Sequence, residues 1–409
     1  MSSRQDNSAA NKPRLFYGYI IVTAAFFIML VVLGGNGFFG VFFKPVSEEF
    51  HWSRAITSAA FSLSSLMGGI SGISIGKLND RFGPRLVITA CGVLVGAGFM
   101  LMSVINDTWQ LFFFYGVLIG LGMSGGYVPT LSTLARWFTS RLNLMSGIVL
   151  IGLSIGELTA APVANGLIER FGWRESYLIL GAIILIVSIL AAQFMKRDPS
   201  TMGLKPYGDP GQTKEDSGVT LREAFVTRQF WTVIAMEFVF GYILMTMLVH
   251  LVPHITDLKI TVTTAAAIMA VTGGASIPGR ITLGLAGDRL GNRAIFMMGF
   301  ILMAICMVWL IFIKDTLSLY FCAALFGFAY GGMESSESPI TVWLFGIKNH
   351  GLIFGALVLA FTVGAAIGPF LTGFVFDFLG SYQTAFFIMA VLSIMGLILT
   401  LTLKPLRKQ

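Results

Sequence analysis

An isolated arginine stands in the middle of an apolar stretch, GGASIPGRITLGLAGDRLGNR at residues 273–293. If this stretch is a helix, Arg280 lies about 12 Å from Asp288 along the axis. A charged side chain inside hydrocarbon costs at least ~2.5 kcal/mol, so it normally faces a cavity and has a function there. The planar guanidinium of arginine matches a carboxylate with two parallel hydrogen bonds. The position therefore indicates a binding site for an organic anion.

Three titratable side chains in other apolar stretches are candidates for carrying a proton together with such an anion. Glu334 and Glu337 lie three residues apart, on successive turns of one helix face. Either glutamate can form a structural pair with Arg280 and release it when an anion arrives. His250 lies near the end of a different apolar stretch, and histidine changes its charge near physiological pH. We favour His250 as the proton carrier, followed by the two glutamates.

The composition is that of a membrane protein. The 409 residues are 56% hydrophobic and 11% charged, whereas a soluble chain carries about 25% charged residues. Apolar runs of 20 or more residues can cross ~30 Å of hydrocarbon, and helices satisfy every backbone donor within such a run. The twelve expected spans are about 17–43, 53–78, 85–105, 108–136, 143–169, 174–195, 228–257, 262–287, 293–313, 316–345, 350–377 and 382–403.

Several functional classes are not expected from the sequence. It contains no nucleophile–base pair typical of an enzyme and no phosphate-binding loop for ATP. The three cysteines have no metal-binding spacing, so we expect neither a metal nor another cofactor. The net charge of +7 could suggest a nucleic-acid ligand, but the distribution of basic residues between the spans explains it better.

That distribution predicts the orientation. With the N-terminus inside, 20 of the 27 Lys and Arg residues fall in inner segments and six in outer segments, while Arg280 lies within a span. Positively charged loops stay on the cytoplasmic side. We therefore expect a multi-pass protein of the inner (plasma) membrane with both termini in the cytoplasm.

The chain is expected to contain two copies of one six-span unit. GKLNDRFGPR at 76–85 and GLAGDRLGNR at 284–293 share both glycines, the Asp-Arg pair and the last arginine, 208 residues apart. Two further pairs of stretches repeat at nearly the same offset. We predict an N-terminal six-helix bundle at 1–195, a cytoplasmic linker at 196–227 and a C-terminal six-helix bundle at 228–409. Thr220 and Glu223 have capping-box spacing, which predicts a short helix in the linker. Parallel repeats put a substrate site between them, near the midplane.

The repeated GxxxDRxGxR motif resembles the signature of the major facilitator superfamily. The resemblance implies an all-α membrane fold of twelve transmembrane helices in two pseudo-symmetric bundles. It also implies that the motif latches the cytoplasmic side shut in the outward-open state. The alternative is that these residues only set loop turns and topology. The expected cytoplasmic gate consists of Asp80, Arg81, Arg85, Asp288, Arg289 and Arg293.

A second stretch, GVFFKPVSEEFHWSR at 40–54, resembles the monocarboxylate transporter branch of that superfamily and the neighbouring oxalate/formate antiporter branch. The resemblance implies that a lone arginine in the eighth span, here Arg280, binds the substrate carboxylate. Animal monocarboxylate transporters carry an aspartate where Ser276 stands and a lysine where Gly37 stands. The eleventh span lacks the basic residue of the oxalate antiporters, and one cationic ligand suits a monocarboxylate.

The cavity of this superfamily is lined by the first, fourth, seventh, eighth and tenth spans, which implies further substrate contacts. A tyrosine hydroxyl could bind a substrate hydroxyl or keto group, although packing of the ring is the simpler explanation. The expected substrate-binding residues are Arg280, Tyr330, Tyr127, Asn36, His250 and Ser276.

The sequence is best interpreted as a transporter of small monocarboxylates, such as lactate or pyruvate, that moves them together with a proton by alternating access. We expect a monomer in the bilayer, with a small monocarboxylate as its partner and no nucleic acid. One alternative is an exchanger of organic anions of the oxalate/formate type. The other is a membrane sensor that binds a carboxylate without transporting it.

Overall fold

The structure is a computed structural model that describes residues 16–208, 218–313 and 315–406, with only the backbone of Arg54. Its N-terminal half holds the elements α1 (Tyr17–Ile28), η1 (Met29–Leu33), η2 (Gly34–Phe38), α2 (Phe39–Glu49), α3 (Arg54–Phe82), α4 (Pro84–Met102), α5 (Thr108–Leu111), η3 (Phe112–Ile119), α6 (Gly120–Trp137) and α7 (Leu142–Phe194). The first span, α1 to α2, changes from α-helix through a π-helical and a 3-10 segment, an irregularity frequent at functional sites.

The C-terminal half follows a linker that carries η4 (Pro199–Met202) and the short helix α8 (Leu221–Phe225). The predicted capping box of Thr220 and Glu223 begins α8. The remaining helices are α9 (Arg228–Asp257), α10 (Val262–Leu290), α11 (Asn292–Phe312), α12 (Thr316–Phe345), α13 (His350–Leu379) and α14 (Gln383–Thr402).

Eleven helical stretches of the described residues are long and apolar enough to cross a membrane. One of them, α7, has 53 residues and contains Gly172, whose φ of 81° and ψ of 168° are not helical. A straight helix of that length would extend roughly 80 Å, more than twice the thickness of the hydrocarbon. The predicted spans at 143–169 and 174–195 therefore lie on either side of Gly172. The prediction of an all-helical protein with twelve spans is confirmed.

The second glycine of each GxxxDRxGxR motif has a structural reason. Gly83 and Gly291 have φ values of 84° and 88°, which side chains with a β-carbon rarely adopt. Gly83 ends α3 and directly precedes α4, and Gly291 does the same between α10 and α11. The repeat thus places one tight turn at the same point of each half.

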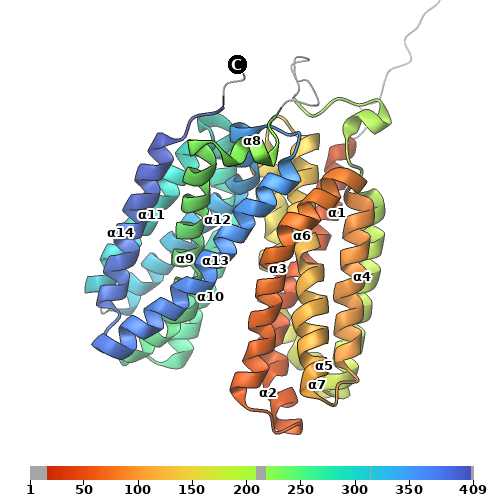
Figure 1. The fold of residues 1–409 in the computed structure, drawn as a ribbon. Helices are drawn as coiled ribbons and strands as arrows, with labels where there is room; N and C mark the ends of the chain where they lie inside the picture. Colours follow the sequence, from red (N-terminus) through yellow and green to blue (C-terminus); the bar gives the residue numbers. More distant parts are fainter. Residues whose placement is uncertain (1–15, 209–217, 314, 407–409) are drawn as a thin grey trace, which may run out of the picture.

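The two halves meet along two pairs of helices, α3 with α13 and α7 with α10. They lie close together at the end of the molecule that carries the linker and α8, and they diverge toward the other end (Figure 1). We call these the linker end and the opposite end. Gly76 and Gly351 bring α3 and α13 into backbone contact, because a β-carbon on either would collide with the other's carbonyl oxygen. Small residues permit such close helix contacts within a membrane.

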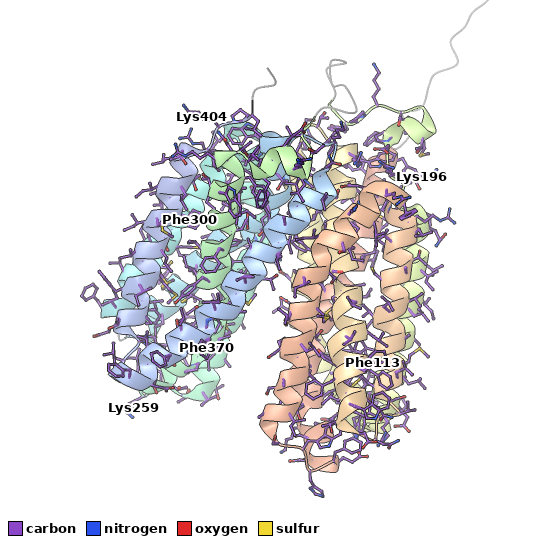
Figure 2. The ribbon with its side chains drawn as sticks, in the orientation of Figure 1. Phe113, Lys196, Lys259, Phe300, Phe370 and Lys404 are labelled. Carbon is purple, nitrogen blue, oxygen red and sulfur yellow. The ribbon has the colours of Figure 1, made fainter. Side chains whose placement is uncertain are left out.

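The surface of the bundles is apolar, and its charges gather at the two ends. Phe113 and Phe370 are 46% and 73% exposed, as expected of side chains that face lipid. Lys196 and Lys404 lie at the linker end and Lys259 at the opposite end (Figure 2). Each half also has its own cluster of buried apolar side chains, with Phe354 of α13 packed into the N-terminal cluster.

Candidate functional site

Arg280 lies on α10 in the interface between the halves and is only 2% exposed. One terminal nitrogen donates to the carbonyl oxygen of Leu150 on α7 at 3.0 Å and to the hydroxyl of Ser154. The other terminal nitrogen donates to a carboxylate oxygen of Glu334 on α12. The guanidinium therefore joins three helices and both halves. Of the two glutamates predicted as its partner, the structure places Glu334 beside it.

Ser276 lies one helical turn from Arg280 and also reaches across the interface. Its hydroxyl is 3.3 Å from that of Ser154, and it donates to the carbonyl oxygen of Gly273 at 2.7 Å. The helix α12 packs tightly here, because a β-carbon on Gly331 would collide with the carbonyl oxygen of Ser276. Tyr330 precedes Gly331, is buried, and lies one turn from Glu334. The structure thus brings Arg280, Ser276, Tyr330 and Glu334 together.

Arg280 keeps one hydrogen-bond donor that an anion could bind. The Nε of Arg280 is buried and has no hydrogen-bond partner in the described part of the chain. The side chain of Glu334 is 13% exposed, while that of Arg280 is 2% exposed, so the carboxylate is the more accessible partner. A buried donor without a partner costs about 1–3 kcal/mol. A ligand carboxylate that replaced Glu334 could satisfy this donor.

A shallow, open hollow of about 400 Å³ lies along α10, toward the opposite end from Arg280. Its lining residues on α10 are Ala270, Val271, Gly274 and Ala275. Ala275 is roughly 7.5 Å from Arg280 along the helix axis. With 3.6 residues per turn, these four positions lie on the face of α10 that points away from Arg280, so the hollow is not part of the cluster.

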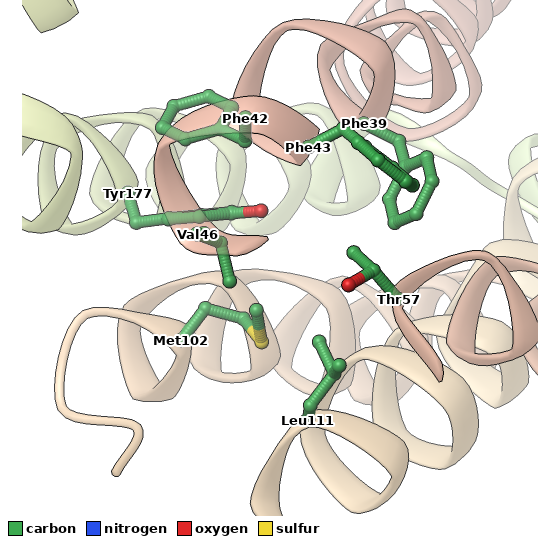
Figure 3. A pocket seen from close by; sticks show the side chains of 8 residues that line it. All are labelled: Phe39, Phe42, Phe43, Val46, Thr57, Met102, Leu111 and Tyr177. Carbon is green, nitrogen blue, oxygen red and sulfur yellow. The ribbon is translucent and has the colours of Figure 1, made fainter. Parts of the chain in front are cut away.

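A second cavity lies inside the N-terminal half, as Figure 3 shows, and it is too small for a substrate. Its volume is about 10 Å³, which is near the minimum for a single water molecule. The residues around it are Phe39, Phe42, Phe43, Val46, Thr57, Met102, Leu111 and Tyr177.

Glu157 of α7 is exposed and interacts electrostatically with both Arg280 and Glu334. Glu157 is not among the site residues predicted from the sequence. Gly37, which stands where animal relatives carry a lysine, packs against the backbone of Glu157, and a β-carbon there would lie 2.7 Å from that of Ala160. The structure therefore has no room for a lysine at position 37 without a shift of the first span.

Two other predicted site residues, Asn36 and His250, form no hydrogen bond with Arg280 in the described part of the chain. Asn36 is half-buried in η2 of the first span. The imidazole of His250 is 3.2 Å from the hydroxyl of Tyr382 and 2.9 Å from the carbonyl oxygen of Pro369. Both partners belong to the C-terminal half, at its opposite end. These contacts give His250 a role in joining α9 to α13 and to the start of α14.

Tyr127 and Glu337 form a separate contact between the halves. The tyrosine hydroxyl on α6 donates to a carboxylate oxygen of Glu337 on α12 at 2.7 Å. The tyrosine ring stacks on Phe354, with the ring centroids 5.9 Å apart. Glu337 follows Glu334 by three residues toward the linker end, so this contact lies between Arg280 and the predicted gate.

The two motif aspartates each accept hydrogen bonds from the first turn of a helix in the other half. The carboxylate of Asp80 on α3 accepts from the backbone nitrogens of Gly351 and Leu352, at 3.3 and 3.0 Å. The carboxylate of Asp288 on α10 accepts from the backbone nitrogens of Asn143 and Leu144, at 2.9 and 3.1 Å. A helix N-terminus favours a negative charge. The pattern repeats at an offset of 208 residues, the offset of the sequence motif.

The arginines of the predicted gate behave differently from the aspartates. Arg81, Arg85 and Arg289 are exposed, and Arg293 donates to a carbonyl oxygen of its own half. Arg136, at the end of α6, is the basic residue at this interface.

The side chain of Arg136 binds the carboxylates of Asp80 at 3.5 Å and of Asp198 in the linker at 3.2 Å. It also donates to the carbonyl oxygen of Ile347 in the other half. Arg136 lies outside the GxxxDRxGxR motif, and the gate predicted from that motif therefore omits it. The sequence feature that could have indicated a place in the gate is its position, six residues before the start of α7.

Comparisons with known proteins agree with this architecture. The sequence matches the profile of the Major Facilitator Superfamily over residues 25–285 and 245–409. The chain is 28% identical over 314 residues to the uncharacterized MFS-type transporter YhjX of Escherichia coli (strain K12), covering 75% of each protein.

Two mammalian relatives match over more of the chain. The rat monocarboxylate transporter 13 is 25% identical, with 93% of this chain and 87% of the rat protein covered. The human monocarboxylate transporter 11 is 27% identical, with 95% of this chain and 83% of the human protein covered.

A solved structure shows the same fold. The proton:xylose symporter XylE, bound to 6-bromo-6-deoxy-D-glucose, superposes with a TM-score of 0.76 over 95% of this chain and 96% of XylE, at 13% identity. The fold, the repeated motif and the match over both halves lead to one conclusion. The chain belongs to the Major Facilitator Superfamily, whose members are membrane transporters.

Proposed function

We propose that the protein transports small monocarboxylates, such as lactate or pyruvate, together with a proton. The observation that carries this proposal is the single arginine buried between the halves and paired with a partly accessible glutamate. One cation with a free donor suits one carboxylate. Arg280 contacts both halves, so a ligand bound there interacts with both parts that must move in alternating access.

The pairing with Glu334 supports a way to couple the anion to a proton. The substrate carboxylate displaces Glu334 from the guanidinium, and the glutamate loses its cationic partner inside a protein. A carboxylate in that position favours its protonated form. One proton from the medium then binds Glu334 as one anion binds Arg280, and the loaded transporter has the same net charge as the empty one. We therefore assign the coupled proton to Glu334 in place of His250.

The neighbouring residues supply the rest of the proposed site. Ser276 and Tyr330 carry hydroxyl groups beside Arg280, where a hydroxyl or keto group of the substrate could bind. With both termini in the cytoplasm, the closed linker end faces inward and the conformation is outward-facing. We propose that the transporter works as a monomer, since both halves of the site come from one chain.

The two mammalian relatives support the substrate class, because both are monocarboxylate transporters. XylE is a proton:xylose symporter, but it takes a different substrate and is only 13% identical to this chain. The coupling proposed here rests on Arg280 and Glu334.

The experiment is uptake of labelled carboxylic acids into proteoliposomes, with and without an inward pH gradient. Each acid of a C2–C6 panel is tested on the wild type and on Arg280→Lys and Arg280→Ala. We expect accumulation of small monocarboxylates that requires the pH gradient and is lost in both variants. Loss of a partner of a buried charge pair costs about 2–5 kcal/mol. Lysine keeps the charge but lacks the fork.

Three results would contradict the proposal. Uptake that requires internal carboxylate and ignores the pH gradient would indicate an anion exchanger. Binding of an acid to the purified protein without any transport into vesicles would indicate a sensor. Unchanged uptake by Arg280→Ala would remove Arg280 from the site.

A further inference from the structure

A second carboxyl group lies buried near Glu337, on the linker side of Arg280. Glu237 comes from α9, in the apolar stretch TVIAMEFVFGY, and is 1% exposed. Glu337 on α12 is 5% exposed. The two carboxyl groups interact electrostatically with each other, and Tyr127 interacts with both. Glu237 is not among the site residues predicted from the sequence, although an acidic residue in an apolar span is a signal of function.

The bonding of the two carboxyl groups is incomplete. Glu337 accepts the hydrogen bond from Tyr127 described above. The Oε1 atom of Glu237 is buried and has no hydrogen-bond partner among the described residues. A buried ionised carboxylate without a partner is strongly unfavourable, and two such groups near each other cannot both stay ionised. At least one of them must therefore hold a proton.

The surrounding groups do not supply a cation that bonds to the pair. Toward the centre of the molecule, Arg280 already forms an ion pair with Glu334. On α13, the imidazole of His350 is within hydrogen-bond distance of the hydroxyl and the carbonyl oxygen of Ser338. At the linker end, Arg136 binds Asp80 and Asp198. The other charged or histidine side chains on helices in contact with α9, α12 and α6 lie toward helix ends, except Glu157, which interacts with Arg280 and Glu334. They are Lys77, Arg81, Arg85, Glu157, Glu169, Arg170, Arg174, Glu175, Arg222, Glu223, Arg228, His250, His254, Asp257, Asp288, Arg289, Arg293 and Asp377.

The position of the pair suggests a direction of proton movement. Glu337 lies about 4.5 Å from Glu334 along the axis of α12, toward the linker end. The hydrogen bond from Tyr127 joins the halves and must break when they separate at that end. Separation would also admit water to the two carboxyl groups. The pair is thus closed to water while the gate of Asp80 and Asp288 is closed.

We propose that Glu237 and Glu337 share one proton while the linker end is closed and release it to water on that side when the end opens. The deprotonated pair then accepts the proton of Glu334, as Glu334 returns to Arg280 after the substrate leaves. Each step transfers one proton between oxygen atoms and changes no other bond. This inference rests on the proposed function and adds an exit route for the proton to it.

The test compares net accumulation with exchange in proteoliposomes. At one proton per anion, an inward gradient of one pH unit supports about tenfold accumulation. We expect Glu237→Gln and Glu337→Gln to lose this accumulation and to keep exchange of labelled for unlabelled lactate, since exchange requires no net proton release. Met236→Leu is the matched control, because Met236 is a buried neighbour of Glu237 on α9. It should retain both activities.

A second measurement does not require transport. Infrared spectra of the purified protein should contain the carbonyl band of a protonated carboxylic acid, reduced in both glutamine variants and unchanged in Met236→Leu. The proposal would be supported if the band is reduced and if gradient-driven accumulation is lost while exchange is kept. Full accumulation by Glu237→Gln, loss of exchange in correctly folded variants, or an unchanged band would overturn it. A wild type that does not accumulate monocarboxylates would instead overturn the proposed function.

Discussion

Gly147 of α7 lies against the backbone of Arg280 on α10, so closely that a β-carbon on Gly147 would collide with the carbonyl oxygen of Arg280. The equivalent pair in the other interface is Gly355 and Gly72, and a β-carbon on Gly355 would lie 2.5 Å from the carbonyl oxygen of Gly72. The backbones repeat the same contact, whereas the side chains differ completely. The side chain of Arg280 is therefore added to a backbone contact that both interfaces share.

This contact predicts the effect of a small substitution. Gly147→Ala should push α7 away from α10 at the depth of Arg280 and favour opening of the linker end. A cysteine placed at Ser338, a buried residue that bonds to Leu131 of the other half, reports opening through its reaction with a maleimide. The rate should rise severalfold. Gly166→Ala on α7 is the control, because no atom lies within 4 Å of its added carbon. Equal rates in both variants would contradict the prediction.

The reciprocal contacts of the motif aspartates make a second prediction. Asp80→Asn and Asp288→Asn should each increase the reaction of the same cysteine, because a charge-assisted hydrogen bond is about twice as strong as a neutral one. Asp80→Asn also removes one of the two anions that bind Arg136. Asp377→Asn, an exposed change near the opposite end, is the control. A linker end that stays closed in both motif variants would exclude the latch.

The exchange of Glu334 for substrate on Arg280 predicts the pH dependence of binding. Protonation of Glu334 frees the arginine, so substrate binding should tighten as the pH falls, by up to about tenfold per pH unit. Glu334→Gln imitates the protonated form. It should bind lactate tightly at every pH and lose accumulation driven by a pH gradient. Titration calorimetry of the purified protein measures both affinities. A pH profile that stays steep in Glu334→Gln would show that another group carries the proton.

The contacts of His250 predict a structural effect of its replacement. His250→Gln should keep accumulation driven by a pH gradient, because the imidazole contacts Tyr382 and Pro369 and is distant from the proposed path. Loss of these hydrogen bonds should cost on the order of 1 kcal/mol of stability. Uptake and thermal unfolding of the same variant separate the two effects. Uptake that no longer responds to the gradient would return His250 to the role first predicted for it.

Much of the fold follows from the sequence because its physical causes are local. The length and polarity of the apolar runs predict the spans, and the GxxxDRxGxR repeat predicts the tight turns at Gly83 and Gly291. Arg280 is identifiable because a charge in a long apolar run is costly wherever the helix packs.

The partners within the site depend on helix packing, which the sequence does not specify. Nothing in the spacing distinguishes Glu334 from Glu337 as the partner of Arg280, although one binds it and the other binds Tyr127. Glu237 is a polar residue in an apolar span by the same criterion as Arg280. Its relation to Glu337 depends on how α9 and α12 are placed around the interface. The contacts of His250 likewise depend on how α13 and α14 pack against α9.

The aspartates that cap helices of the other half also relate opening to water. While the linker end is closed, the backbone N–H groups of Asn143, Leu144, Gly351 and Leu352 bind carboxylates. When the halves separate, these donors and both carboxylates must be hydrated, so opening takes up solvent as well as changing shape. Solutes that are excluded from protein surfaces lower the activity of water and oppose such hydration. The conformational equilibrium of this transporter is therefore also sensitive to osmotic pressure.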